Sequence, residues 1–211
     1  NAYKMKYTDV ESITGTINQM FLEKPELVTT FKMKGKEYGF IPNLDDMTLG
    51  EYIDLDTYSG EYKNIEVAMN VFYRPIIAKV GKKYIIKKYN PETKEEILDM
   101  PMDAVVSSLF FFSEFRIGVV KNYPELFENT SNNTVGGVQA FAAKYGWYQS
   151  IFALSGGDVT RIENITELKF QECFLMLAFM KDKNELEAKQ IKSKIKWANK
   201  EQEPFTKSQK L

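Results

Sequence analysis

Few side chains in this sequence have a type and spacing that could support chemistry. The most concentrated group is acidic, because residues 41–62 contain six carboxylates and no lysine or arginine. Asp54 and Asp56, together with Asp45, could place oxygen atoms on a divalent cation. The window lacks the loop glycine pattern of a calcium site, so charge at helix ends and on a solvated face is the simpler interpretation. A carboxylate-dependent metal enzyme is kept as an alternative.

Nucleophilic and phosphate-binding chemistry has little support. The 211 residues include no histidine and one cysteine, Cys173, which excludes histidine-activated nucleophiles, imidazole zinc sites and an internal disulfide framework. Cys173 follows Glu172 on an apolar stretch where nothing lowers its pKa, so we expect a buried structural thiol. The Ser-Gly-Gly-Asp sequence at 155–158 follows a predicted helix and lacks the lysine of a P-loop, which indicates a helix end. We therefore expect a non-enzymatic protein with no catalytic residue, no metal site and no cofactor.

The elements that would position these residues are mostly helical. Apolar residues at helical spacing predict five longer helices, over residues 8–23, 61–73, 102–121, 135–154 and 170 to about 199. A capping box of Thr48 and Glu51 starts a short helix that reaches about Leu55, and Thr93 with Glu96 forms a second possible box.

Two stretches of alternating residues predict β-hairpins, over 29–41 around Gly35 and over 76–89 around Gly81-Lys82. The second hairpin is half polar on both faces, so we expect it to be exposed or paired with something external. The predicted fold class is α+β, predominantly α-helical, with one or two β-hairpins.

The chain length suits one compact domain with a C-terminal extension. The polar stretch 128–134 is the best boundary, dividing residues 1–127, with the N-terminal helix, hairpins and central helices, from the helical residues 135–211 with a basic tail. The longest apolar run, within 104–112, is too short to span a membrane, so we expect no membrane partner. A single thiol and the lack of an export signal favour a reducing cytoplasm.

Charge is arranged in blocks, although the whole chain carries only −1. The window 41–62 carries −6, whereas 74–88 carries +6, with Arg74, Lys82, Lys83 and Lys87 among its basic residues. One hypothesis is that the two blocks meet across a subunit boundary and close a ring of copies. The alternatives are that they meet within one subunit or face water.

The C-terminal residues 189–211 hold seven lysines against two glutamates, or +5, and include Trp197. This segment could be an arm that docks on an acidic neighbour, a solvated helix and tail, or a contact with the backbone of DNA or RNA. The candidate contact residues are Asp54, Asp56, Arg74, Lys82, Lys83, Lys87 and Trp197.

Several stretches carry a resemblance to a known group of proteins. They read FIPNLDDMTLGEYIDL at 40–55, AMNVFYRPI at 68–76, YGWY at 145–148, LSGGD at 154–158, ECF at 172–174 and KDKNELE at 181–187. Together they resemble small proteins encoded among the structural genes of tailed bacteriophages, particularly crAss-like phages of gut bacteria. These proteins resemble tail assembly chaperones, and related chains are virion components of the portal, neck or tail, or carried cargo.

The resemblance covers roughly residues 38–190 and brings no catalytic residue with it. It implies a structural or assembly role in a phage particle, with other phage structural proteins as partners and the virion as the location. An alternative is a tail assembly chaperone that binds the tape-measure protein in the host cytoplasm and is absent from the finished particle.

Overall fold

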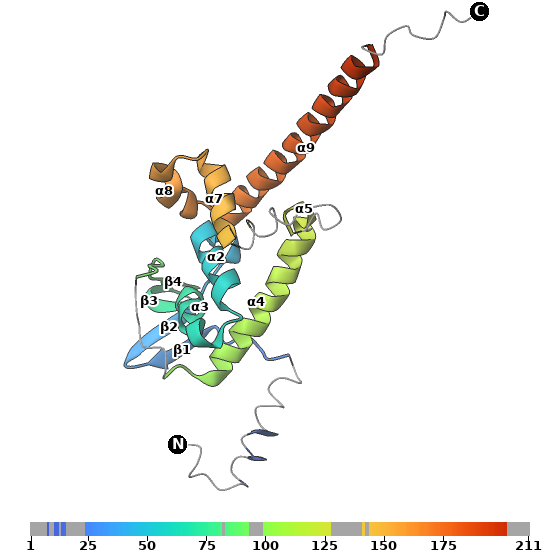
Figure 1. Cartoon of the computed structure of the whole chain (residues 1–211). Coiled ribbons are helices and arrows are strands. Elements are labelled where there is room, and N and C mark those ends of the chain that lie inside the picture. The colour runs from blue at the N-terminus through green and yellow to red at the C-terminus, as the bar shows by residue number, and fades with distance from the viewer. Residues whose placement is uncertain are drawn as a thin grey trace, which may run out of the picture.

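The computed structural model describes residues 24–81, 83–92, 99–127 and 144–201, with isolated positions at 8, 11, 12, 14, 15 and 141. Four antiparallel strands form one sheet in the order β1-β2-β3-β4, and helices pack around it (Figure 1). The strands are β1 (Thr30–Met33), β2 (Lys36–Phe40), β3 (Tyr73–Val80) and β4 (Lys83–Ile86). The predicted α+β class, predominantly helical with β-hairpins, is confirmed.

Both predicted hairpins are present, and they join into one sheet. The turn between β1 and β2 places Gly35 at a φ of 75°, a conformation that glycine adopts without a steric penalty. Strand β2 pairs with β3 through Gly39 opposite Arg74 and Phe40 opposite Tyr73. A Cβ atom at Gly39 would lie 2.5 Å from Cε2 of Tyr84, so any larger residue there would displace the Tyr84 ring. The second hairpin therefore finds a neighbour within the chain, which leaves β4 at the sheet edge.

Helix α2 (Leu49–Tyr58) begins at the predicted capping box and ends at Tyr58 rather than near Leu55. The Thr48 hydroxyl accepts from the Glu51 backbone amide at 3.2 Å, and a Glu51 carboxylate oxygen accepts from the Thr48 amide at 2.8 Å. The helix buries Tyr52 and Leu55 completely. This cap fixes where α2 starts and therefore which of its side chains point inward.

The predicted helix over 61–73 is a short 3-10 turn, η3 (Tyr62–Asn64), followed by α3 (Ile65–Phe72). Helix α3 ends before Pro75, as expected. Its last residue is Phe72, and Tyr73 already has an extended backbone with a φ of −122°. Helix α4 (Met102–Asn122) matches the predicted long helix and packs against the core through Phe112 and Val119.

The remaining elements lie in the second half of the chain. They are α5 (Pro124–Phe127), α7 (Trp147–Ser155), η4 (Val159–Arg161), α8 (Ile162–Thr166) and α9 (Phe170–Glu201). The short η2 (Leu44–Asp46) precedes α2. None of the helices in the described ranges is long and apolar enough to cross a membrane.

The prediction of one helix over 135–154 is wrong at Gly146. That glycine adopts a φ of 46° and a ψ of −128°, which helical geometry does not allow, so α7 begins only at Trp147. The predicted end at 155–158 is confirmed, because Gly156 caps α7 in the left-handed conformation. Most of the predicted 8–23 helix, the Thr93 capping box and the 128–134 boundary lie outside the described residues.

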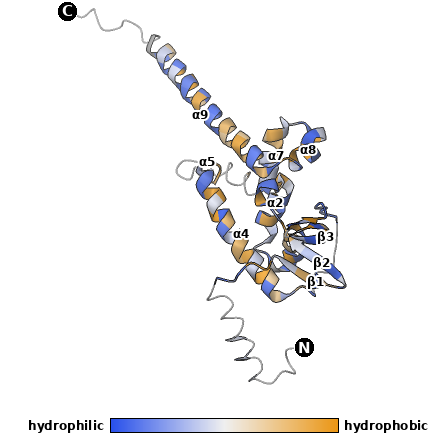
Figure 2. Ribbon diagram, turned by 180° about the vertical axis from the view of Figure 1, so that it is seen from behind, coloured by the Kyte–Doolittle hydropathy of each residue, from blue (hydrophilic) through white to orange (hydrophobic). Residues whose placement is uncertain are grey.

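One aromatic cluster joins the two halves of the chain. Tyr52 of α2 stacks on Phe170 at 5.1 Å between ring centres, and Trp147 stacks on Phe174 at 5.7 Å. Phe112 of α4 contacts Tyr52 edge-on. The N-terminal part of α9 is therefore anchored in the core, whereas its C-terminal part extends away from the body (Figures 1 and 2). Hydrophobic residues recur along this extension (Figure 2).

Candidate interaction surfaces

The acidic residues before α2 contact the start of α9. The Lys169 ammonium donates to Oδ1 of Asp46 at 2.7 Å, and the Gln171 side-chain amide donates to Oδ1 of Asp45 at 2.9 Å. The hydrogen bond from Lys169 lowers the pKa of Asp46 below its usual value. Phe170 lies between these two donors and is buried in the core, so the contacts fasten η2 to the base of the long helix.

Glu51 and Arg74 form a buried ion pair between α2 and β3. One guanidinium nitrogen of Arg74 lies 2.8 Å from Oε1 of Glu51, and their side chains are only 12% and 6% exposed. The same carboxylate caps α2 through its other oxygen. The Arg74 guanidinium also lies over the Tyr89 ring at 6.0 Å, and the Tyr89 hydroxyl donates to Oδ2 of Asp54 at 2.6 Å.

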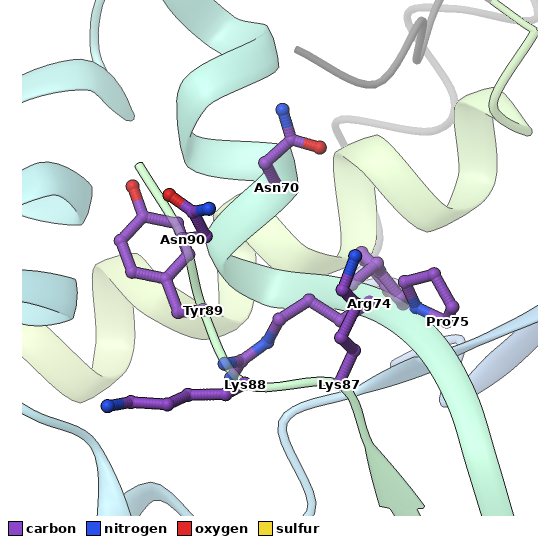
Figure 3. Close-up of a pocket in the computed structure, with 8 residues that line it drawn as sticks. Asn70, Arg74, Pro75, Lys87, Lys88, Tyr89 and Asn90 are labelled. Carbon is purple, nitrogen blue, oxygen red and sulfur yellow. The ribbon is translucent and has the colours of Figure 1, made fainter. Parts of the chain in front are cut away.

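Burial dominates the electrostatics of this cluster. It raises the pKa of Asp54 above its usual value, although the hydrogen bond from Tyr89 opposes that effect. Burial also lowers the pKa of Arg74, and the Glu51 charge opposes the shift. The adjoining hollow, lined by Asn70 and Asn90 among others, measures about 20 Å³, which is room for about one water molecule (Figure 3). These contacts join α2 to β3 and to the segment after β4.

Asp56 connects α2 to two other helices. The Arg116 Nε donates to Oδ1 of Asp56 at 2.5 Å, and the Trp147 indole N–H donates to Oδ2 at 3.0 Å. The Asp56 side chain is only 14% exposed. Asp54 and Asp56 therefore have partners within the chain, which disfavours their use as contacts with another subunit.

The three carboxylates considered for a metal ion are engaged separately. Asp45 accepts from Gln171, Asp54 from Tyr89, and Asp56 from Arg116 and Trp147. In the described ranges, no group of three or more aspartate, glutamate, cysteine or histidine residues could hold a metal ion.

The described lysines of the basic window are all exposed, and two of them are ion-paired. Lys79 binds Glu37 and Lys88 binds Glu167, each at 2.6 Å. Lys83 and Lys87 are exposed near the sheet edge, whereas Lys82 lies outside the described residues. Among the described residues, the acidic and basic windows are joined by the Glu51–Arg74 ion pair, which forms within one chain.

The C-terminal half of α9 is exposed along its length. Every residue from Asp182 to Asn199 is classed as exposed, and Trp197 retains 68% of its accessible surface. Ile191 and Ile195 are 58% and 55% exposed. The sequence reasoning singled out Trp197 and the lysines but missed the two isoleucines. Their four-residue spacing was the available signal, which the surrounding charge obscured.

Cys173 is buried on the core side of α9, as predicted. Burial raises the pKa of its thiol to about 11, and the neighbouring Glu172 charge adds to the shift. The thiol therefore acts as a small apolar side chain in the packing between α8 and α9.

Comparisons with protein-family models, with curated proteins and with solved structures found no match to this chain.

Proposed function

We propose that this chain is a non-enzymatic structural or assembly component of a tailed bacteriophage particle that acts through protein–protein contacts. The observation that carries the proposal is the free half of α9, which extends from the body and exposes Ile191, Ile195 and Trp197 to solvent. Large exposed apolar side chains on an ordered helix are typical of a surface that a partner covers. The phage setting rests on the sequence resemblance.

The contrast between body and extension supports a contact role. The acidic side chains around α2 are used to hold α2, α4, α7 and β3 together. The extension instead presents unburied lysines and apolar residues on one rigid rod. Such an arm can reach a neighbouring protein of the portal, neck or tail region without disturbing the core.

A tail assembly chaperone that binds the tape-measure protein is the second candidate. An open hollow of about 530 Å³ between α5, α7 and α9 favours it. Its apolar lining comes from Leu126, Phe127, Trp147, Leu177 and Met180. A hollow of this size and composition could receive apolar side chains of an extended or helical polypeptide.

Quantitative mass spectrometry of purified particles of the encoding phage, compared with the infected-cell lysate, separates these two roles. Peptides of this chain at a fixed ratio to the tail and portal proteins are expected for a virion component. Abundance in the lysate with loss from purified particles would replace that role with the chaperone. Absence of the gene from any phage structural gene cluster would overturn both.

A further inference from the structure

Helix α9 carries one continuous stripe with the spacing of a coiled coil. Steps of four and three residues alternate through Phe170, Phe174, Leu177, Lys181, Asn184, Ala188, Ile191, Ile195 and Ala198. Residues at this spacing occupy the a and d positions of heptads and lie along one side of a helix. The stripe has a polar interruption at Lys181 and Asn184, where the helix leaves the body.

The two ends of the stripe have different surroundings. At the base, the core covers Phe170, Phe174 and Leu177, which are 1%, 0% and 9% exposed. Beyond the interruption, Ile191 and Ile195 keep more than half of their accessible surface. The stripe that begins in the core therefore continues, turned by about 20° per heptad, as an uncovered apolar surface, which we call the distal seam (Ala188, Ile191, Ile195 and Ala198).

Basic residues flank the distal seam. Between residues 188 and 199 the helix has four lysines and no aspartate or glutamate, which gives +4. Lys192 and Lys194 occupy the e and g positions beside the isoleucines, where charge selects the partner helix. A complementary helix would carry apolar residues at a and d and acidic residues at e and g.

A second copy of this chain fits the distal seam poorly. An antiparallel pair centred on Ile191 and Ile195 would place Lys192 opposite Lys192 of the second copy, and Lys194 opposite Lys194, which is repulsive. A parallel pair would continue down the same side of α9 toward its base. There, Leu126 and Phe127 of α5 already face Ala188 across the hollow. The acidic residues of α2 are also engaged within the chain.

We infer that the distal seam docks an acidic amphipathic helix of a different protein, forming a short two-stranded coiled coil. The apolar side of that helix covers Ile191 and Ile195, and its carboxylates pair with Lys192 and Lys194. The inference shares with the proposed function only the premise that the chain acts by protein contact.

Fluorescence anisotropy with the full chain tests the inference. The probe is a labelled three-heptad peptide with leucine at a and d and glutamate at e and g, whose like charges oppose its self-association. The double variant Ile191→Asp, Ile195→Asp is expected to weaken binding by at least about tenfold, because it places carboxylates in the seam. Both isoleucines are exposed, so these changes leave the core untouched.

Leu186→Asp is the matched control. Leu186 is 57% exposed on the same free half of α9, yet it lies two and a half turns from Ile195 and so on the opposite side. Binding is expected to stay within about twofold of the unaltered chain, because the added carboxylate lies on the opposite side of the helix and the seam is intact. A peptide with lysine at e and g should bind at least about tenfold more weakly than the acidic one.

Four results would overturn the inference. Equal peptide binding by the isoleucine double variant and the Leu186 control would show that the distal seam is not the binding site. A scrambled glutamate peptide that binds as tightly as the heptad peptide would show that the site is only nonspecific basic charge. Duplex DNA that binds more tightly than the heptad peptide, and is insensitive to the isoleucine changes, would show the same. Dimerisation of the chain alone, abolished by the isoleucine changes, would make a second copy the occupant. Absence from phage particles would refute the proposed function but leave peptide binding intact.

Discussion

The two ends of α9 share one heptad spacing and have opposite environments. At the base, Phe174 is completely buried and contacts aromatic rings of α2, α5 and α7. At the far end, Ile195 is 55% exposed. Charged residues offer a similar contrast, since the Glu51–Arg74 pair of the body is only 6% and 12% exposed, whereas Lys192 of α9 is exposed. Spacing alone therefore specifies which side of a helix is apolar, and the rest of the molecule determines whether that side is covered.

The largest expected difference is between apolar truncations at the two ends of α9. Phe174→Ala should lower the free energy of unfolding by about 3–5 kcal/mol, because it removes a fully buried ring and leaves a cavity. Ile195→Ala should change it by less than about 0.5 kcal/mol, because the side chain is exposed. Urea unfolding followed by circular dichroism measures both. Similar losses for the two variants would show that the far end of α9 is packed on the body.

The same comparison applies to charged residues. Arg74→Met should destabilise the fold by about 3 kcal/mol, because it leaves Glu51 buried without its counter-charge. Lys192→Met should have an effect within about 0.5 kcal/mol. Adding Glu51→Gln to Arg74→Met should recover part of the loss, since the amide oxygen can still accept from Thr48. A double variant as unstable as the sum of the single ones would refute the pairing.

Thiol reactivity distinguishes the two halves without changing stability. The pKa of Cys173, raised to about 11, reduces its thiolate fraction at pH 8 about 100-fold relative to an unshifted thiol, and burial slows access further. The thiol introduced by Ser193→Cys in the exposed half should react with a disulfide reagent at the rate of a free thiol. Fast reaction of Cys173 in the native chain would show that the base of α9 opens readily.

Signals that act over a few residues predicted much of the fold. The Thr48–Glu51 capping box, the Gly35 turn, the stop at Gly156 and the extent of α4 and α9 all appear as expected. Each depends on hydrogen bonds or backbone preferences within one or two turns of chain.

Contacts between distant residues could not be predicted in the same way. Gly39 of β2 leaves room for the ring of Tyr84 on β4, which comes 45 residues later in the sequence. The sequence left open whether the acidic window meets the basic one across a subunit boundary, within one subunit, or not at all. In the structure Glu51, Asp54 and Asp56 find partners within the chain, on β3, after β4, and on α4 and α7. The residues of a segment give its net charge, but only the tertiary structure brings each charged side chain to its partner. No other residue near Gly146 signalled that the helix would break there.

An unbroken helix from core to tip is also a mechanical element. Residues 182–201 of α9 rise about 1.5 Å each, so the free part is a lever about 30 Å long. A tilt of about 10° at the aromatic base would move the tip by about 5 Å over that length. A load applied at the tip is conveyed to the rings of Tyr52, Trp147 and Phe174, so these side chains set how stiffly the arm is held.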